Sequence, residues 1–110
     1  MNGAIIPVDI HQEDIQTEYS CYREGNIVII WLRGLHITNG AVPSGFSIGS
    51  DYRPKEVLYA PVVVVKSGTS RSVGYAELNT SGQLTPIDIV SGAYVLNFTG
   101  TLYGEFVFKV

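Results

Sequence analysis

The residue types that usually carry out catalysis are few in this sequence and lie far apart. The two histidines are His11, in a polar N-terminal segment, and His36, in an apolar run. Nucleophilic catalysis needs a base within reach of an activated serine or cysteine. The single cysteine, Cys21, lies in a run of alternating polarity, which is typical of a packed side chain. We therefore expect surface or strand-edge histidines and no nucleophilic centre.

Acidic residues give no pattern for glycoside hydrolysis or metal binding. The ten Asp and Glu residues are scattered, and Glu13-Asp14 is the one adjacent pair, which a solvated face explains. Hydrolysis of glycosides needs two facing carboxyl groups, and metal sites need clusters of His, Cys or carboxylate ligands. The sequence therefore predicts a protein that is not an enzyme, with no metal site and no cofactor.

Aromatic side chains are the remaining resource for ligand binding, with seven Tyr, four Phe and one Trp. Tyrosine can stack on a sugar ring while its hydroxyl group forms hydrogen bonds. Asp51, Tyr52 and Arg53 are consecutive in a loop and are our candidate ligand-binding residues, together with Tyr103. Alternatively, both tyrosines have a structural role and contact no ligand. Tyr52 in particular would anchor the loop, because Pro54 stiffens the backbone there.

The elements that position these residues are predicted to be strands. Short β-rich runs alternate with Gly, Pro, Asn and Ser, and no segment has a helical period of convincing length. This pattern predicts an all-β fold, an antiparallel β-sandwich or barrel of jelly-roll-like type. We expect residues 1–16 to be an N-terminal arm or linker, with a helical turn or loop from residue 11 to 18. Residues 17–110 are then one head domain.

The strand after Gly25-Asn26 is the clearest single element. Gly and Asn tolerate positive φ, so this pair predicts a tight hairpin turn. The strand that follows is apolar on both faces, with Ile27, Ile29 and Trp31 on one and Val28, Ile30 and Leu32 on the other. Such a strand is expected to be buried on both sides, inside the domain or between subunits. Trp31 is therefore expected to pack in a core rather than to contact a ligand.

Composition limits the partners. Charged residues are 15% of the chain, against roughly 25% in a typical soluble domain. This favours a large interface with other copies or a larger assembly, and the alternative is a hydroxyl-rich surface. The net charge is −3 and no basic stripe is present, so nucleic acid is not an expected partner. The apolar run at residues 57–65 is too short to span a membrane, and no signal peptide is visible.

Four motifs follow one another in an order that resembles the pattern in the C-terminal domains of bacteriophage tail-tip, tail-fibre and baseplate proteins. These motifs are Tyr22-Arg23-Glu24-Gly25-Asn26-Ile27-Val28-Ile29, Pro43-Ser44-Gly45-Phe46, Tyr52-Arg53-Pro54 and Thr80-Ser81-Gly82. An aromatic C-terminal strand follows them, and the order covers residues 17–110. Here residues 45–51 separate the Pro-Ser-Gly element from Arg53-Pro54, whereas the family pattern has a compact Leu-Pro-Gly-Phe-Arg-Pro form.

This resemblance implies a non-enzymatic domain in the virion tail, made in the host cytoplasm, that binds a host cell-surface saccharide for adsorption. It also implies a homotrimer in contact with other tail or baseplate proteins. The alternative is a structural module that contacts only other virion proteins. Sugar-binding residues vary between members of such families, so the resemblance assigns no role to Asp51, Tyr52, Arg53 or Tyr103.

Overall fold

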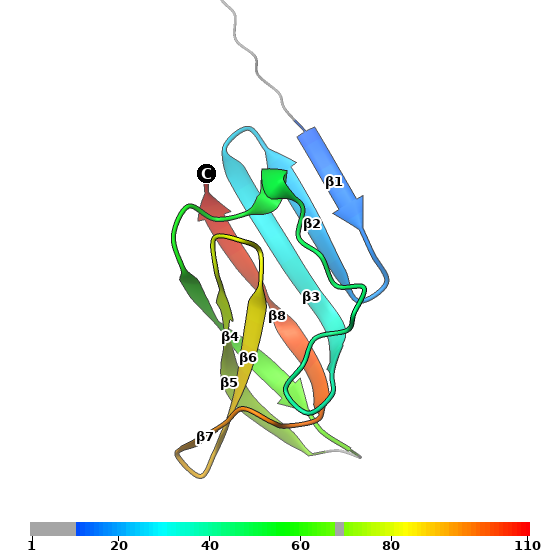
Figure 1. Cartoon of the computed structure of the whole chain (residues 1–110), viewed down its shortest axis with the longest axis vertical. Coiled ribbons are helices and arrows are strands. Elements are labelled where there is room, and N and C mark those ends of the chain that lie inside the picture. The colour runs from blue at the N-terminus through cyan, green and yellow to red at the C-terminus, as the bar shows by residue number, and fades with distance from the viewer. Residues whose placement is uncertain (1–10, 68–69) are drawn as a thin grey trace, which may run out of the picture.

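The computed structural model describes residues 11–67 and 70–110, and in them the chain is all-β, as the sequence predicts (Figure 1). One 3-10 turn, η1, accompanies the strands. The elements are β1 His11–Ile15, β2 Tyr19–Glu24, β3 Ile27–Ile37, η1 Ser50–Tyr52, β4 Leu58–Val65, β5 Arg71–Leu78, β6 Leu84–Val90, β7 Ala93–Val95 and β8 Gly100–Lys109. Across these two described ranges, no helix has the length and apolar character needed to cross a membrane.

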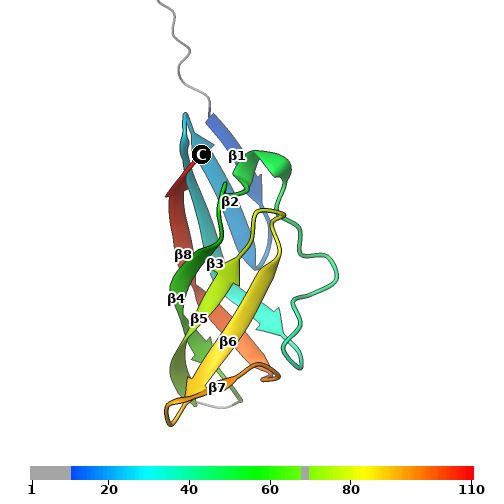
Figure 2. The ribbon, with the colours of Figure 1, turned by 60° about the vertical axis from the view of Figure 1, so that its left-hand side comes forward.

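All strands join in one sheet in the order β1-β2-β3-β8-β4-β5-β6-β7, and every neighbouring pair is antiparallel. The last strand, β8, lies between β3 and β4. It therefore joins strands β1 to β3 to strands β4 to β7. The two edge strands, β1 and β7, lie at opposite ends of the molecule in both views (Figures 1 and 2). The described sheet is therefore open, which favours the sandwich over the closed barrel.

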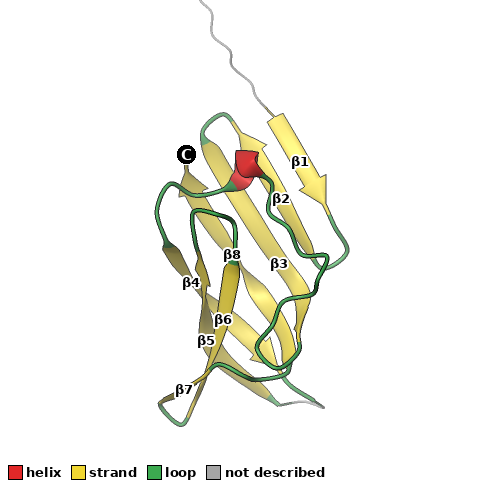
Figure 3. Ribbon diagram, in the orientation of Figure 1, coloured by secondary structure: helices red, strands yellow, loops and turns green. Residues whose placement is uncertain are grey.

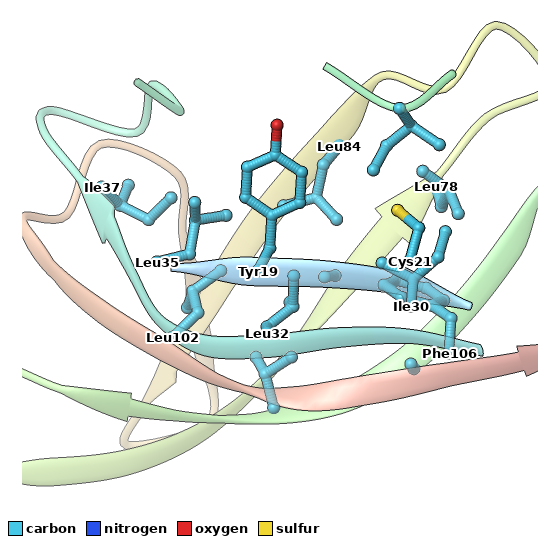
Figure 4. Close-up of a cluster of buried hydrophobic side chains, with 14 of the residues drawn as sticks. Tyr19, Cys21, Ile30, Leu32, Leu35, Ile37, Leu78, Leu84, Leu102 and Phe106 are labelled. Carbon is cyan, nitrogen blue, oxygen red and sulfur yellow. The ribbon is translucent and has the colours of Figure 1, made fainter. Parts of the chain in front are cut away.

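A single core lies on the inner face of this sheet. It takes side chains from β2, β3, β8, β4, β5 and β6, so the two halves of the sheet face each other across it as in a β-sandwich. Figure 4 shows Tyr19 and Cys21 rising from β2 toward the side on which Leu78 and Leu84 lie. The expectation for Cys21 is confirmed, because its side chain is fully buried in this cluster.

The long connection between β3 and β4 covers one edge of the core (Figure 3). Phe46 packs its ring 4.6 Å from the ring of Tyr19, and Ile48 is buried. The Tyr19 hydroxyl group lies 3.1 Å from both the backbone oxygen and the backbone nitrogen of Ser47. Phe46 and Ile48 therefore attach this loop to the core, as the sequence predicts.

β3 is buried on one face only, which corrects the expectation for Trp31. Val28, Ile30 and Leu32 are buried, but Ile27 is exposed on the opposite face and Trp31 is 49% exposed there. The sequence predicts the alternation correctly, because successive strand residues point to opposite faces. It does not predict that only one of the two apolar faces meets the core.

The N-terminal segment also differs from the expectation. Residues 11–15 form strand β1 rather than a helical turn or loop, and Ile15 pairs with Ser20 of β2. The sheet thus begins at residue 11, inside the arm expected for residues 1–16. Charged side chains are common on edge strands, because they hinder the free edge from pairing with another chain. The expectation for residues 1–10 lies outside the described part of the chain.

A buried carboxylate stabilises the end of the sheet near β6. Asp88 is fully buried and accepts hydrogen bonds from Lys66 Nζ (2.7 Å), Ser72 Oγ (2.6 Å) and the Ile89 backbone N–H (2.9 Å). Burial by itself raises the pKa of Asp88, but the hydrogen bonds and the Lys66 charge outweigh it and hold that pKa below its ordinary value. A carboxylate whose pKa is lowered by folding stabilises the fold above the unfolded-state pKa.

We expect Asp88→Asn to lower the free energy of unfolding by about 2 to 3 kcal/mol at neutral pH, because Lys66 loses its charge partner in a half-buried place. The difference from wild type should shrink below about pH 4, where Asp88 becomes protonated in the unfolded chain. Urea unfolding at pH 7 and pH 3 measures both effects. A difference that stays constant with pH would contradict the ionised state of Asp88.

Candidate ligand-binding site

A polar depression of about 490 Å³ lies where three loops meet at one end of the sheet. The β2–β3 turn, the segment around η1 and the β5–β6 turn each contribute to it, together with the end of β8. Its lining residues are Arg23, Asn26, Ser50, Asp51, Arg53, Pro54, Lys55, Thr80 and Val110. Segments that are distant in sequence therefore form one surface here.

The β2–β3 turn is built on Gly25, as predicted. Gly25 has a φ of +59°, whereas Asn26 keeps a negative φ, the pattern of a turn with glycine at its first central position. Arg23 precedes this turn. Its Nε donates to the Gly25 backbone oxygen and its Nη1 donates to the Asp51 backbone oxygen, both at 2.9 Å. Arg23 thus fixes the position of η1 against the end of β2.

η1 places Asp51 and Tyr52 on different sides of the backbone. Asp51 is exposed at the depression, and its Oδ2 accepts a hydrogen bond from Gln12 Nε2 (3.3 Å). Tyr52 is only 8% exposed and belongs to the core, and burial raises the pKa of its hydroxyl group. The structural alternative for Tyr52 is therefore correct: it anchors the loop and does not line the depression.

Arg53 joins the depression to the β5–β6 turn. Its Nε donates to the Ile48 backbone oxygen at 2.9 Å. Gly82, in the β5–β6 turn, packs closely against both groups. An added Cβ at Gly82 would lie 3.0 Å from the Ile48 backbone oxygen and 3.1 Å from Arg53 Nε. The φ of Gly82 is +81°, a value that favours glycine. Within this turn, Asn79 Oδ1 accepts the Ser81 and Gln83 backbone N–H groups at 3.0 and 2.9 Å. The turn is thereby rigid, and Thr80 reaches the depression.

The charges of this depression are mostly positive. Arg23, Arg53 and Lys55 supply three cationic side chains against one carboxylate side chain, that of Asp51, on a chain whose net charge is −3. Lys55 is exposed. Guanidinium and ammonium groups donate hydrogen bonds, and the carboxylate accepts them. The surface therefore presents several hydrogen-bond donors and one carboxylate acceptor to solvent.

Tyr103 does not belong to this site. It lies on the outer face of β8, is 46% exposed and pairs with Arg33 of β3. Along β8 it is about 24 Å from Val110, which is too far for contact with one small ligand. The Tyr103 hydroxyl oxygen lies over Gly34, where a Cβ added to Gly34 would be 3.1 Å from it. Gly34 has a φ of +86° and lies at the register shift between Arg33 and Leu35. Tyr103 thus covers a bulge in β3.

Other chemical groups lie outside the depression. His36 is exposed in β3, and both its backbone N–H and its Nδ1 contact the Glu18 carboxylate, at 2.9 and 2.8 Å. The hydrogen bond from the His36 backbone lowers the pKa of Glu18. His11 is exposed in β1 near Glu13, so both histidines are surface strand residues as expected. Among the described residues, no group of three His, Cys, Asp or Glu side chains could hold a metal ion.

Residues Gly45-Phe46-Ser47-Ile48-Gly49 spell the Gly-x-Ser-x-Gly pattern of hydrolase nucleophiles. In those enzymes the serine lies on a sharp turn between a strand and a helix. Here Ser47 lies in the long loop between β3 and β4, where its backbone contacts the Tyr19 hydroxyl group. The surroundings of Ser47 are therefore not those of a nucleophile elbow.

The sequence matches no protein-family model and no curated protein.

The sequence predicts Asp51 and Arg53 as ligand-contacting residues, but it does not predict that Arg23, Asn26, Lys55 and Thr80 also line the depression. A signal was present for three of them, because Arg23 and Asn26 flank the Gly25 turn and Thr80 begins the Thr-Ser-Gly turn. Nothing in the sequence indicates that these two turns meet the loop at residues 50–55. Lys55 carries no motif of its own.

We expect Arg23→Gln to lower the free energy of unfolding by about 1 kcal/mol, because the hydrogen bonds to the Gly25 and Asp51 carbonyl groups are lost. Amide hydrogen exchange in η1 should become faster at the same time. Lys55→Gln is the matched control, since it removes an exposed charge from the same depression. Equal stability losses in the two variants would show that Arg23 does not fix η1.

Proposed function

We propose that this chain is a non-enzymatic domain of a bacteriophage tail or baseplate that binds a bacterial cell-surface saccharide during host adsorption. One observation carries the proposal. The Tyr22–Ile29 and Tyr52–Pro54 motifs, which give the sequence its resemblance to such proteins, converge on the polar depression through Arg23, Asn26 and Arg53.

The chemistry of the depression supports a saccharide as its ligand. The Asp51 carboxylate can accept hydrogen bonds from sugar hydroxyl groups, and Arg53, Lys55 and Thr80 can donate to ring and hydroxyl oxygens. The excess of positive charge favours a saccharide with anionic substituents, because charge-assisted hydrogen bonds are about twice as strong as neutral ones. Arg23 and Arg53 are already held by backbone carbonyl groups, so their positions cost little entropy on binding.

The proposal also covers partners and location. The chain would act in the virion tail, where the resemblance implies a homotrimer in contact with other tail or baseplate proteins. The second candidate function is a structural tail module that binds virion proteins only. The exposed apolar residues on the outer face of the sheet, among them Trp31, Tyr103 and Val107, favour it.

Binding of the purified chain to a panel of extracted bacterial wall polysaccharides tests the first function. We expect at least one polysaccharide to bind, and Lys55→Met and Asp51→Asn each to weaken that binding about five- to tenfold, since each removes a charge-assisted hydrogen bond. Glu56→Gln is the control, because Glu56 is exposed but lies outside the lining residues. The release of reducing ends should stay at background.

Two outcomes would overturn this proposal. If no polysaccharide binds while neighbouring tail proteins are captured from phage particles, the structural function replaces it. If a polysaccharide binds but Lys55→Met and Asp51→Asn leave its affinity unchanged, the ligand site lies elsewhere on the chain.

A further inference from the structure

An apolar groove of about 490 Å³ lies on the outer face of the sheet, beside the start of β1. We call it the Ile29 groove. Tyr22, Ile27 and Ile29 give it an apolar surface, because they point away from the core and alternate with buried residues of β2 and β3. Ile27 is exposed, and Ile29 is only partly buried. The lining residues are His11, Tyr22, Arg23, Glu24, Ile27 and Ile29.

The chain enters the sheet at the rim of this groove. His11 is both a lining residue of the groove and the first residue of β1. Residues 1–10 precede it and lie outside the described part of the chain. The segment joined directly to His11 is therefore the part of the chain that can cover the groove with the shortest connection.

Residues 4–8 have a composition that suits an apolar surface. They read Ala-Ile-Ile-Pro-Val, and no charged side chain occurs before Asp9. The residue before a proline is biased toward extended backbone, and here that residue is Ile6. In an extended segment Ile6 and Val8 point to the same side, because successive side chains alternate. The two side chains can therefore enter one groove together.

Charges at the rim of the groove favour an uncharged occupant. His11 Nε2 lies 3.4 Å from Glu13 Oε2, and His11 Nδ1 lies 3.8 Å from Glu24 Oε1. These two carboxylates would repel an acidic segment, but residues 1–8 carry no charged side chain. Asp9 is only two positions from His11, so its charge stays near the rim and away from the apolar surface.

The segment is long enough to reach the middle of the groove. His11 pairs with Glu24, and Glu24 pairs with Ile27. Ile29 lies two residues further along β3. With strands about 4.8 Å apart and a rise of about 3.3 Å per residue, the distance from His11 to Ile29 is about 12 Å. The five-residue step from His11 back to Ile6 spans up to about 17 Å when extended, which leaves length for a turn.

We propose that residues 4–8 fold back over the start of β1 and that Ile6 and Val8 fill the Ile29 groove of their own chain. A short tether gives the attached segment an effective concentration in the millimolar range. The segment of the same chain, held at the rim by His11, is therefore favoured over that of a second copy at micromolar concentration. Burial of the apolar side chains on both sides drives the contact.

Pro7 favours this side-chain contact over a further strand at the free edge of β1. Proline has no backbone N–H, so a strand that contains Pro7 would lack one donor of the ladder. The groove needs no backbone pairing, because its surface consists of side chains. Trp31 and Tyr103 are not among the lining residues, so the contact leaves them free for the contacts between subunits that a homotrimer requires.

Disulfide trapping tests the proposal on the full chain. We expect Ile6→Cys combined with Ile29→Cys to form a disulfide within one chain under mild oxidation at micromolar concentration. Ile6→Cys combined with Ser50→Cys is the matched control, because Ser50 is exposed in η1, which contacts β1 from the side that holds the core. The Ile29 pair should react about tenfold faster, since docking raises the effective concentration of residue 6 at the groove. Cys21 is fully buried and does not compete.

Three outcomes of this experiment would overturn the proposal. Equal rates for the two pairs would show that the segment has no preference for the groove. A disulfide that joins two chains, seen as a doubled mass without reductant, would place the segment on a neighbouring copy. The absence of any disulfide in the Ile29 pair would show that the segment does not reach the groove.

Methyl NMR spectra of the full chain give a second readout that leaves the sheet unchanged. We expect the double variant Ile6→Asn and Val8→Asn to shift the methyl signals of Ile29 and to leave those of Val73, on β5, in place. Ile5→Asn is the matched control, because alternation points Ile5 away from the groove. Unchanged Ile29 signals in the double variant, or an equal shift with Ile5→Asn, would overturn the proposal.

Discussion

The insertion of β8 between β3 and β4 is the constraint on which the rest of the structure depends. β8 pairs with β3 over Ile27 to Ile37 and with β4 over Val62 to Val65, so it joins two sets of hairpins into one sheet. Its inward side chains, Leu102 and Phe106, are buried at the centre of the core. Without β8, the two sets of strands would have no shared apolar layer to bury, and burial of such a layer is the main driving force of folding.

The same constraint decides which surfaces of the sheet are covered and which are exposed. With β8 in place, the inner face of the sheet is closed by the second half of the sheet and by the loop that carries Phe46 and Ile48. The outer face of β3 and β8 receives no cover from the described chain, which leaves Trp31 exposed. At the end of β8, the Val110 N–H donates to Asn26, and this contact brings the chain end beside the turn and η1 that form the polar depression.

The fold class could be predicted from the sequence, and so could much of its detail. The Gly25 turn, the alternation along β3 and the packing of Phe46 and Ile48 are local consequences of residue type and spacing. For the candidate site, the sequence identified Asp51 and Arg53 because charged residues beside turn formers stay in loops. It did not predict β1. The polar residues of β1 are equally compatible with a loop, and they form a strand because they pair with the free edge of β2. It also could not separate Tyr52 from Tyr103, because burial of a tyrosine depends on distant neighbours.

By itself, the sequence determined that this protein is an antiparallel β domain with sparse chemistry and two apolar faces on its longest strand. Hydrophobic periodicity and turn residues depend on a few neighbouring positions, so the strands and turns can be predicted without knowledge of the fold. Only the tertiary structure decided which of those faces is buried, and that Arg23, Asp51 and Arg53 share one depression. Those outcomes follow from the pairing of strands far apart in the chain, and no local pattern encodes which strands will meet.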